Sequence, residues 1–253
     1  MRVDVHAHYF PELYLAMLDD FHGPPDRTAE ARKSGGGSAP AQVEARLAAM
    51  DATGVDVQLL SAPPLTPYFE DAWQALGAAR VANAAYADLL AAHPGRFRAL
   101  ASLPLPNGLA AADELGRTMD ELDFLGAAVT ATVLGRPLSD PEFVPLFEAL
   151  ELRGAVLLVH PVDGEDPARI YERLDLAPYP SVRLITTGPT PPPRPLNPLH
   201  HHAVSDADGL RRAAVTFGPG RLLLGSGFPY GTETADHALV PDENAVELLG
   251  LGW

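Results

Sequence analysis

Apolar segments of strand length alternate along this chain with amphipathic segments of helix length, and this alternation constrains the fold more than any other feature. Strands are predicted at 1–8, 55–61, 97–103, 126–133 and 155–160, and the helices between them at 41–53, 68–92, 109–122 and 141–153. Such an alternation is typical of βα units in a parallel sheet. The segment 155–160 is almost wholly apolar, as expected of a strand that is buried on both faces.

The pattern is less regular after residue 161. It predicts a short helix at 167–174, strands at 182–187, 202–205 and 221–226, and helices at 206–217 and 242–249. Pro occupies six of the eleven positions from 188 to 198, which excludes a helix there. Eight strands in all predict an α/β fold of the (β/α)8 TIM-barrel type, a single domain over 1–253 with a shortened or irregular C-terminal third. We also expect a flexible loop at 33–40 (KSGGGSAP) and an irregular Pro-rich loop at 188–202.

Charge and composition exclude several classes of protein. The chain has 33 Asp and Glu against 18 Lys and Arg, a formal net charge of −15, and no basic stripe that could bind a nucleic acid. It contains no cysteine, which excludes disulfides, thiolate nucleophiles and Cys-ligated metals and leaves His and carboxylates as metal ligands. No apolar run approaches 18 residues and the amino terminus lacks a secretory pattern, so we expect a cytoplasmic protein without a membrane partner.

The most informative local feature is the pair His6 and His8 at the end of the first predicted strand. Residues i and i+2 of a strand point to the same face, so both imidazoles can converge on one ion where barrel enzymes place their sites. His160 ends the fifth predicted strand, where an unpaired polar ring is costly unless a hydrogen bond or a metal satisfies it. Taken singly, the pair of His6 and His8 could be incidental, and His160 could be a hydrogen-bonded core residue. Together they predict a site for a divalent metal, zinc first, with an open position for water.

Several short motifs occur in an order that matches a known family. They are VDVHAHYFP at 3–11, RLAAMD at 46–51, HPGRF at 93–97, ASLP at 101–104, LGRPL at 134–138 and HP at 160–161. On these motifs the chain resembles the amidohydrolase superfamily, specifically the branch that contains 2-amino-3-carboxymuconate-6-semialdehyde decarboxylase and related metal-dependent aromatic acid decarboxylases. The resemblance is nearly continuous up to residue 163 and patchy beyond it.

The resemblance implies a barrel whose metal, usually zinc, is held by two His of the first strand, the His that ends the fifth strand and an Asp that ends the eighth. A further His after the sixth strand handles protons in the family. His6, His8 and His160 match the three ligand histidines. Gly227 stands where the family has the Asp, and Thr187 stands where it has the proton-handling His.

The resemblance also implies a substrate contact and an assembly. Arg46 matches an arginine that lies near the substrate carboxylate, and a guanidinium binds a carboxylate with two hydrogen bonds. The alternative for Arg46 is an exposed arginine on a helix surface. The resemblance also suggests that the protein forms a homodimer. It suggests a small-molecule carboxylic acid as the substrate.

Other side chains could take over the two missing roles, and each has a plainer interpretation. One of His200, His201 and His202 could turn toward the metal, or all three could lie in a solvated loop. Asp206 or Asp208 could supply a carboxylate. The position of Asp206 just before an apolar-periodic segment favours a helix N-cap instead.

Three functions are compatible with these observations. The first is a metal-dependent decarboxylase, a carbon–carbon lyase, that acts on a small unsaturated or aromatic carboxylic acid, with Arg46 near the carboxylate. The second is a metal-dependent hydrolase or hydratase on the same barrel. The third is a degenerate or shortened family member without catalysis. Gly227, Thr187 and the shortened or irregular final third of the chain favour this alternative. We predict the first, with activity crippled or rerouted unless other residues substitute, because general acid–base groups contribute ~10²–10⁴-fold in rate.

Overall fold

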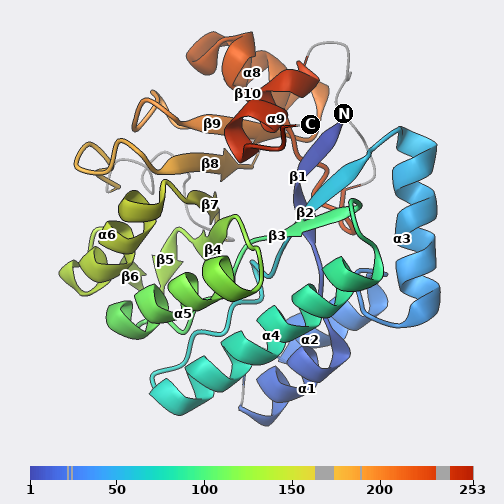
Figure 1. Cartoon of the computed structure of the whole chain (residues 1–253), viewed down its shortest axis with the longest axis vertical. Helices are drawn as coiled ribbons and strands as arrows, with labels where there is room; N and C mark the ends of the chain where they lie inside the picture. Colours follow the sequence, from blue (N-terminus) through green and yellow to red (C-terminus); the bar gives the residue numbers. More distant parts are fainter. Residues whose placement is uncertain (22, 24, 163–173, 189, 232–239, 253) are drawn as a thin grey trace.

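The central feature of the fold is an eight-stranded parallel sheet. The computed structural model describes residues 1–21, 23, 25–162, 174–188, 190–231 and 240–252. The strand order is β3-β2-β1-β10-β9-β8-β7-β4. A parallel bridge between Ala101, just after β3, and Ala127 of β4 joins the two ends of the sheet. The sheet therefore closes into a barrel whose strands follow chain order (Figure 1), which confirms the predicted fold class.

Each barrel strand overlaps a predicted segment. The strands are β1 (Val3–His8), β2 (Val57–Ser61), β3 (Phe97–Ala99), β4 (Gly126–Thr130), β7 (Val156–His160), β8 (Arg183–Thr187), β9 (His201–Val204) and β10 (Leu222–Leu224). A short antiparallel hairpin, β5 (Thr132–Val133) with β6 (Arg136–Pro137), follows β4. Strand β9 begins at His201, so the irregular segment predicted at 188–202 ends two residues earlier than expected.

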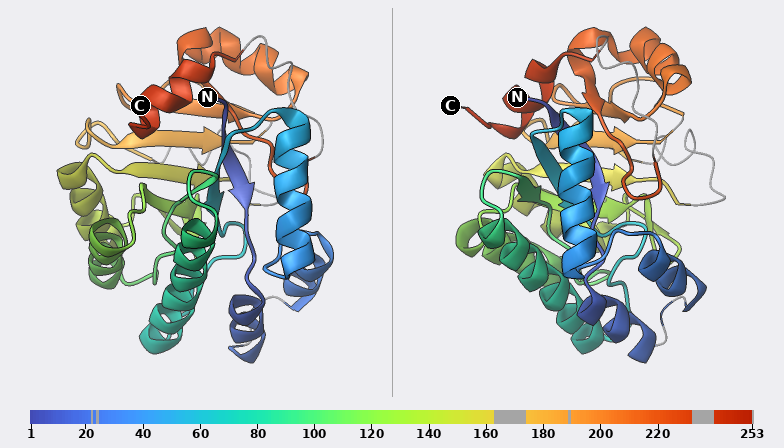
Figure 2. Two further views of the ribbon diagram at one scale, coloured as in Figure 1. Left: turned by 45° about the vertical axis from the view of Figure 1, so that its right-hand side comes forward. Right: turned by 90° about the vertical axis from the view of Figure 1, so that its right-hand side faces the viewer.

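Helices cover the outside of the barrel (Figures 1 and 2). They are α3 (Pro40–Thr53), α4 (Ala72–Ala92), α5 (Gly108–Glu121), the 3-10 turn η1 (Pro141–Phe143) with α6 (Val144–Arg153), α8 (Ala207–Phe217), η2 (Pro219–Arg221) and α9 (Asp242–Leu249). Gly54 and Gly154 end α3 and α6 with φ of +68° and +53°, left-handed conformations that glycine adopts without steric cost. These two turns lead the chain directly into β2 and β7. The predicted helix at 167–174 lies, apart from Leu174, outside the described residues.

Two helices that the sequence patterns did not predict follow β1. Helix α1 (Glu12–Asp20) packs against α4, and α2 (Pro25–Lys33) packs against α1. The chain then returns to the end of β1, where the Phe10 N–H donates to the Gly36 carbonyl at 2.9 Å and Phe10 pairs with Gly37. Part of the KSGGGSAP segment is thus in backbone contact with Phe10, just after β1. Its flexibility stays a prediction.

An irregularity in β1 decides which of its side chains face the barrel interior. The register against β2 shifts between Asp4 and Ala7, the mark of a β-bulge. Val5 packs in the interior cluster, and His6, the next residue, lines a cavity at the barrel mouth. Asp4 lies on the outer side, against α3. The bulge therefore places an imidazole at the mouth and a carboxylate in the layer between sheet and helices.

Aliphatic side chains fill the interior of the barrel, and α9 closes the end formed by the amino ends of the strands. The interior cluster comprises Val3, Val5, Val57, Leu59, Leu100, Ala128, Val156, Leu158, Ile185, Ala203 and Leu223, with Ala245, Leu248 and Leu249 of α9. Helix α9 packs beside β1 and β10, so the first and last elements of the fold are neighbours (Figure 1). The open end is the one formed by the carboxyl ends of the strands, where barrel enzymes carry their sites. In the part of the chain that the structure describes, no helix has the length and apolar character needed to cross a membrane.

Candidate metal centre

Three histidine side chains meet at the carboxyl ends of β1 and β7. His6 and His8 come from β1, and His160 is the last residue of β7. Their candidate ligand nitrogens all lie within 4.8 Å of one another. The ring centroids are 4.7 Å apart for His6 and His8, and those two rings lie 5.2 and 5.4 Å from the ring of His160. The structure thus brings together the three side chains that were predicted as metal ligands.

Hydrogen bonds indicate which ring nitrogen of each histidine faces the shared space. Nε2 of His6 and Nδ1 of His8 are buried and have no hydrogen-bond partner among the described residues. Nδ1 of His6 lies 2.9 Å from Thr187 Oγ1, the His8 ring hydrogen-bonds the backbone of Pro63, and Nδ1 of His160 lies 2.7 Å from the carbonyl of the next residue. Buried nitrogens without a partner are costly, and a divalent cation between the rings would satisfy them. The residues present therefore fit a metal ion.

Burial keeps His6 and His8 in the neutral form that can bind a metal. Loss of hydration lowers the pKa of both imidazoles well below the usual 6.5, and the neighbouring histidines, with Arg46 in the case of His8, lower it further. Neutral imidazole offers the lone pair that a cation needs. A divalent ion that binds here at neutral pH therefore displaces few protons.

The three histidines line an open cavity of about 340 Å³ at the mouth of the barrel. Its lining consists of His6, His8, Pro64, His160, Thr187, Gly188, Ser205, Ser226, Gly227, Tyr230 and Gly231. Among the described residues, no Arg, Lys, Asp or Glu lines this cavity. The volume lies near the lower end of the range for small-molecule sites. An anionic ligand would therefore meet a cation held by the histidines, not a basic side chain.

Arg46 lies inside the protein and does not reach this cavity. Its side chain is fully buried. Nη1 donates to Gln58 Oε1 at 3.0 Å, Nη2 donates to the His8 carbonyl, and the guanidinium lies over the Phe228 ring at 4.4 Å from its centroid. Burial lowers the pKa of Arg46 to about 10, which leaves it charged at neutral pH. The alternative of an exposed helix arginine is wrong, and the contact that Arg46 makes is with the backbone of a candidate ligand.

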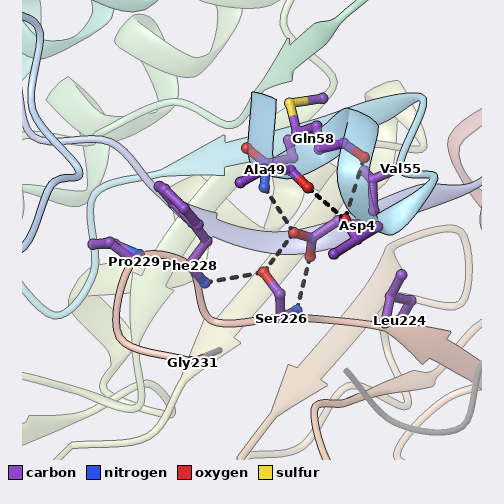
Figure 3. Close-up of a pocket in the computed structure, with 11 residues that line it drawn as sticks. Asp4, Ala49, Val55, Gln58, Leu224, Ser226, Phe228, Pro229 and Gly231 are labelled. Carbon is purple, nitrogen blue, oxygen red and sulfur yellow. Dashed lines mark hydrogen bonds between the residues drawn. The ribbon is translucent and has the colours of Figure 1, made fainter. Parts of the chain in front are cut away.

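Asp4 is a buried carboxylate that the sequence analysis did not single out. Figure 3 shows it between Gln58 and Ser226, on the wall of a second, mostly apolar cavity of about 250 Å³. Its oxygens accept hydrogen bonds from Gln58 Nε2 at 3.0 Å, Ser226 Oγ at 2.6 Å, Ser226 N at 2.9 Å and His6 N at 3.2 Å. Four donors around one carboxyl group indicate the ionised form, although burial raises the pKa of Asp4. The available signal was a carboxylate between two valines of the predicted strand, two residues before the first histidine of the pair.

Comparison with known proteins identifies the family. The amidohydrolase family model matches residues 3–187. The chain belongs to the amidohydrolase family. It is 33% identical over 119 residues to the 2-amino-3-carboxymuconate-6-semialdehyde decarboxylase of Dictyostelium discoideum, a match that covers 47% of this chain and 33% of that protein. It is 36% identical over 140 residues to the gamma-resorcylate decarboxylase of Rhodococcus jostii strain RHA1, which covers 51% of this chain and 43% of that protein. This amidohydrolase thus spans less than half the length of either relative.

Solved structures share the fold of this amidohydrolase. A 2,6-dihydroxybenzoate decarboxylase complexed with 2,6-dihydroxybenzoate gives a TM-score of 0.78 at 22% identity, over 98% of this chain and 99% of that chain. A dihydroxybenzoic acid decarboxylase from Polaromonas sp. JS666, with bound manganese and the inhibitor 2-nitroresorcinol, gives a TM-score of 0.77 at 20% identity, over 99% of this chain and 97% of that chain. At these identities the likeness establishes the fold, in agreement with the predicted barrel.

The two positions at which the resemblance implies other residues, Gly227 and Thr187, both lie beside His6. A Cβ on Gly227 would lie 3.9 Å from Cε1 of His6, so position 227 adjoins the candidate ligand without a carboxylate. The Gly227 N–H donates instead to the His6 carbonyl at 2.7 Å. Thr187 contacts His6 through its hydroxyl group. A backbone amide and a hydroxyl therefore occupy the places where the resemblance implies a carboxylate and an imidazole.

The candidate substitutes do not line the cavity of the amidohydrolase. His200, just before β9, and His202, within β9, are fully buried, and both rings contact Phe217 of α8. The interpretation of these two as parts of a solvated loop is therefore wrong, and so is a turn toward the metal. Asp206 is the N-cap of α8, since its carboxylate accepts from the Gly209 N–H at 2.7 Å, as predicted.

Proposed function

We propose that this amidohydrolase is a metal-dependent decarboxylase, a carbon–carbon lyase, of a small unsaturated or aromatic carboxylic acid. One observation carries the proposal: ring nitrogens of His6, His8 and His160 converge, and the inward nitrogens of the first two are buried without a hydrogen-bond partner in the described chain. The reaction class is supported by the names of the relatives, which are decarboxylases of such acids.

The proposal assigns one divalent cation to His6, His8 and His160, with zinc as the first candidate. Imidazole ligands suit zinc, and three protein ligands with an open position are typical of catalytic zinc. Manganese is the alternative, since the Polaromonas relative is described with bound manganese. When bound, such a cation supplies Lewis acidity to an oxygen of the substrate. Arg46 supports the site through its hydrogen bond to the His8 carbonyl.

The protein itself would orient the substrate and provide a proton. The Tyr230 ring lies with its centroid 5.7 Å from that of His8 and forms an aromatic wall against which a flat substrate can pack. A proton must replace the carboxyl group at the carbon, and the lining hydroxyl groups of Tyr230 and Ser205 are candidate donors. Burial raises the pKa of Tyr230, so its phenol is protonated at neutral pH. We expect slow turnover, because a dedicated acid or base contributes ~10²–10⁴-fold.

Product analysis tests this function. The chain is loaded with Zn²⁺ or Mn²⁺ and incubated with 2,6-dihydroxybenzoate and related unsaturated and aromatic acids. We expect metal-dependent release of carbon dioxide that disappears in His160→Ala. The matched control is His93→Ala, which removes an imidazole at the end of α4, outside the cavity. Metal-loaded protein that consumes water without releasing carbon dioxide would instead be the hydrolase or hydratase.

A second candidate is a metal-binding barrel without catalysis, which Gly227 and Thr187 favour because they leave the cavity without a carboxylate or a spare imidazole. Metal binding with no product from any acid would support it and contradict the lyase. The homodimer and the cytoplasmic location stay predictions. Sedimentation of the purified chain tests the first of these.

A further inference from the structure

Thr187 reaches His6 across the mouth of the barrel. Thr187 ends β8 and His6 lies in β1, and β9 and β10 stand between these strands in the sheet. Thr187 Oγ1 is 2.9 Å from His6 Nδ1, and both side chains are buried. The contact joins residues 181 positions apart in the chain, so it exists because the barrel closes. Which of the two groups donates in this hydrogen bond depends on which nitrogen of His6 carries the proton.

The surroundings of His6 favour one tautomer. If Nδ1 carries the proton, it donates to Thr187 Oγ1, and the lone pair of Nε2 faces His8 and His160. If Nε2 carries the proton, a buried N–H points at two other imidazoles, and Nε2 has no acceptor among the described residues. An unpaired buried donor is costly, and it would also block metal binding. The first tautomer is therefore the one that the geometry supports.

The end of β8 is fixed by a hydrogen-bond relay that reaches the lining of the cavity only at Gly188. The Leu196 N–H donates to His200 Nδ1 at 2.9 Å, so the neutral ring carries its proton on Nε2 and donates it to Thr186 Oγ1 at 2.8 Å. Thr186 in turn donates to His202 Nδ1 at 2.9 Å, and His202 Nε2–H donates to the Gly188 carbonyl at 3.2 Å. The relay ties down the residues on either side of Thr187. Buried networks in which every member is satisfied rigidify their surroundings.

The backbone of His6 is held independently of Thr187. Its N–H donates to Asp4 Oδ1 at 3.2 Å, and its carbonyl accepts from the Gly227 N–H at 2.7 Å. Replacing the Thr187 hydroxyl therefore leaves these backbone contacts in place. The effect of such a replacement falls on the orientation and the tautomer of the imidazole.

We propose that Thr187 is a positioning residue that accepts the Nδ1 proton of His6 and so directs Nε2 toward His8 and His160. The part that concerns metal affinity rests on the proposed function. Hydrogen bonds to the non-ligating nitrogen of a metal-binding histidine fix its tautomer, and their loss costs about 10–100-fold in metal affinity. A hydroxyl group at position 187 thus takes an orienting role where the resemblance implies a proton-handling imidazole.

Nitrogen chemical shifts of metal-free, ¹⁵N-labelled protein test the tautomer, with the His6 signals assigned by their loss in His6→Gln. We expect the Nδ1–H tautomer in the wild type and in Thr187→Ser, which keeps the hydroxyl group. Thr187→Val is nearly isosteric but lacks the hydroxyl group. This variant should lose the Nδ1–H tautomer of His6 and bind Zn²⁺ about 10–100-fold more weakly in a chelator competition. Thr118→Val is the matched control, because it removes a buried threonine hydroxyl of α5 that bonds the Leu115 carbonyl.

The proposal is overturned if wild-type His6 carries its proton on Nε2, or if Thr187→Val keeps both the Nδ1–H tautomer and the wild-type Zn²⁺ affinity. If Thr187→Val does not fold, the wild type and Thr187→Ser decide: Nδ1–H in both supports the proposal, and its absence from either contradicts it. Wild-type protein that binds no Zn²⁺ but shows the expected tautomers overturns the proposed function and leaves the role of Thr187 standing.

Discussion

His6, His8 and His160 each hold one ring nitrogen in a hydrogen bond with the protein and turn the other toward a common space. The anchoring partners are the Thr187 hydroxyl and backbone groups at the end of β2 and β7. Anchored imidazoles lose little freedom when a cation binds, so this arrangement favours binding. The site formed by these three histidines lacks a carboxylate at position 227.

Restoring that carboxylate should raise activity at a cost in stability. Gly227 has φ of +68°, so Gly227→Asp forces a left-handed conformation and should lower the free energy of unfolding by ~1–2 kcal/mol. The new carboxylate lies beside His6, and we expect carbon dioxide release by the metal-loaded protein to rise by up to ~10²-fold. Both quantities are measured on the same preparations.

The matched control for this substitution is Gly218→Asp. Gly218 has φ of +69° and open space around its Cβ position, away from the cavity. Gly218→Asp should also lower the free energy of unfolding, because φ of +69° with ψ of 163° strains any residue other than glycine, but it should bring no gain in activity. Equal activity of the two variants would contradict a role for position 227 in the reaction.

Acidification should destabilise the fold through His202. Burial lowers the pKa of His202 from 6.5 to about 4, so below pH 6.5 the unfolded chain binds a proton that the native protein does not. Its contribution to stability is therefore complete above pH 6.5 and is lost as the pH falls toward 4, by roughly 3 kcal/mol in all. Urea unfolding between pH 7.5 and 4.5 measures this slope. His202→Gln should make the slope less steep by the share of one histidine, while the contributions of the buried His6, His8 and His200 remain. An unchanged slope in that variant would count against the buried neutral ring of His202.

At the scale of elements, the buried charges of Asp4 and Arg46, bridged by Gln58, join β1, β2 and α3. Asp4 of β1 accepts from the amide of Gln58 in β2, whose oxygen accepts from Arg46 of α3. The amide lies with its donor toward the anion and its acceptor toward the cation. Arg46 continues to the His8 carbonyl, so both ends of the bulged part of β1 are held.

Breaking this pair should be costly. Arg46→Met leaves Asp4 ionised and buried without the balancing cation, and loss of one member of a buried pair lowers the free energy of unfolding by about 3–5 kcal/mol. Arg153→Met, which removes a surface pair with Asp120 at 2.7 Å, should cost less than about 1 kcal/mol. Chemical denaturation compares the two variants. Equal losses would show that the Arg46 network is not a coupled charge pair.

The sequence predicted elements where periodicity is strong and missed contacts that the tertiary fold creates. The barrel strands and their intervening helices followed from apolar runs and helical spacing. Helix α2 buries Thr28 and Ala31 alone, so it has no apolar face to detect. The histidine cluster followed from strand ends, whereas the Asp4–Gln58 contact spans 54 residues and depends on a bulge that no local pattern marks.

At the scale of the whole molecule, closure of the barrel assembles the site. His6 and His8 of the first strand meet His160 of the fifth and Thr187 of the sixth at one mouth. Helix α9 seals the opposite end with apolar side chains. A ligand therefore has one described cavity at the histidines, and the chemistry of the molecule depends on whether a cation binds there.

X-ray absorption at the zinc edge, on protein loaded with one equivalent of Zn²⁺, tests that central claim most directly. The account predicts one tightly bound ion per chain with three imidazole nitrogens at roughly 2.0–2.1 Å. It also predicts loss of imidazole ligands and of tight binding in His6→Ala, His8→Ala and His160→Ala, but not in His93→Ala. Failure to retain zinc, or an identical spectrum in the three site variants, would contradict the account.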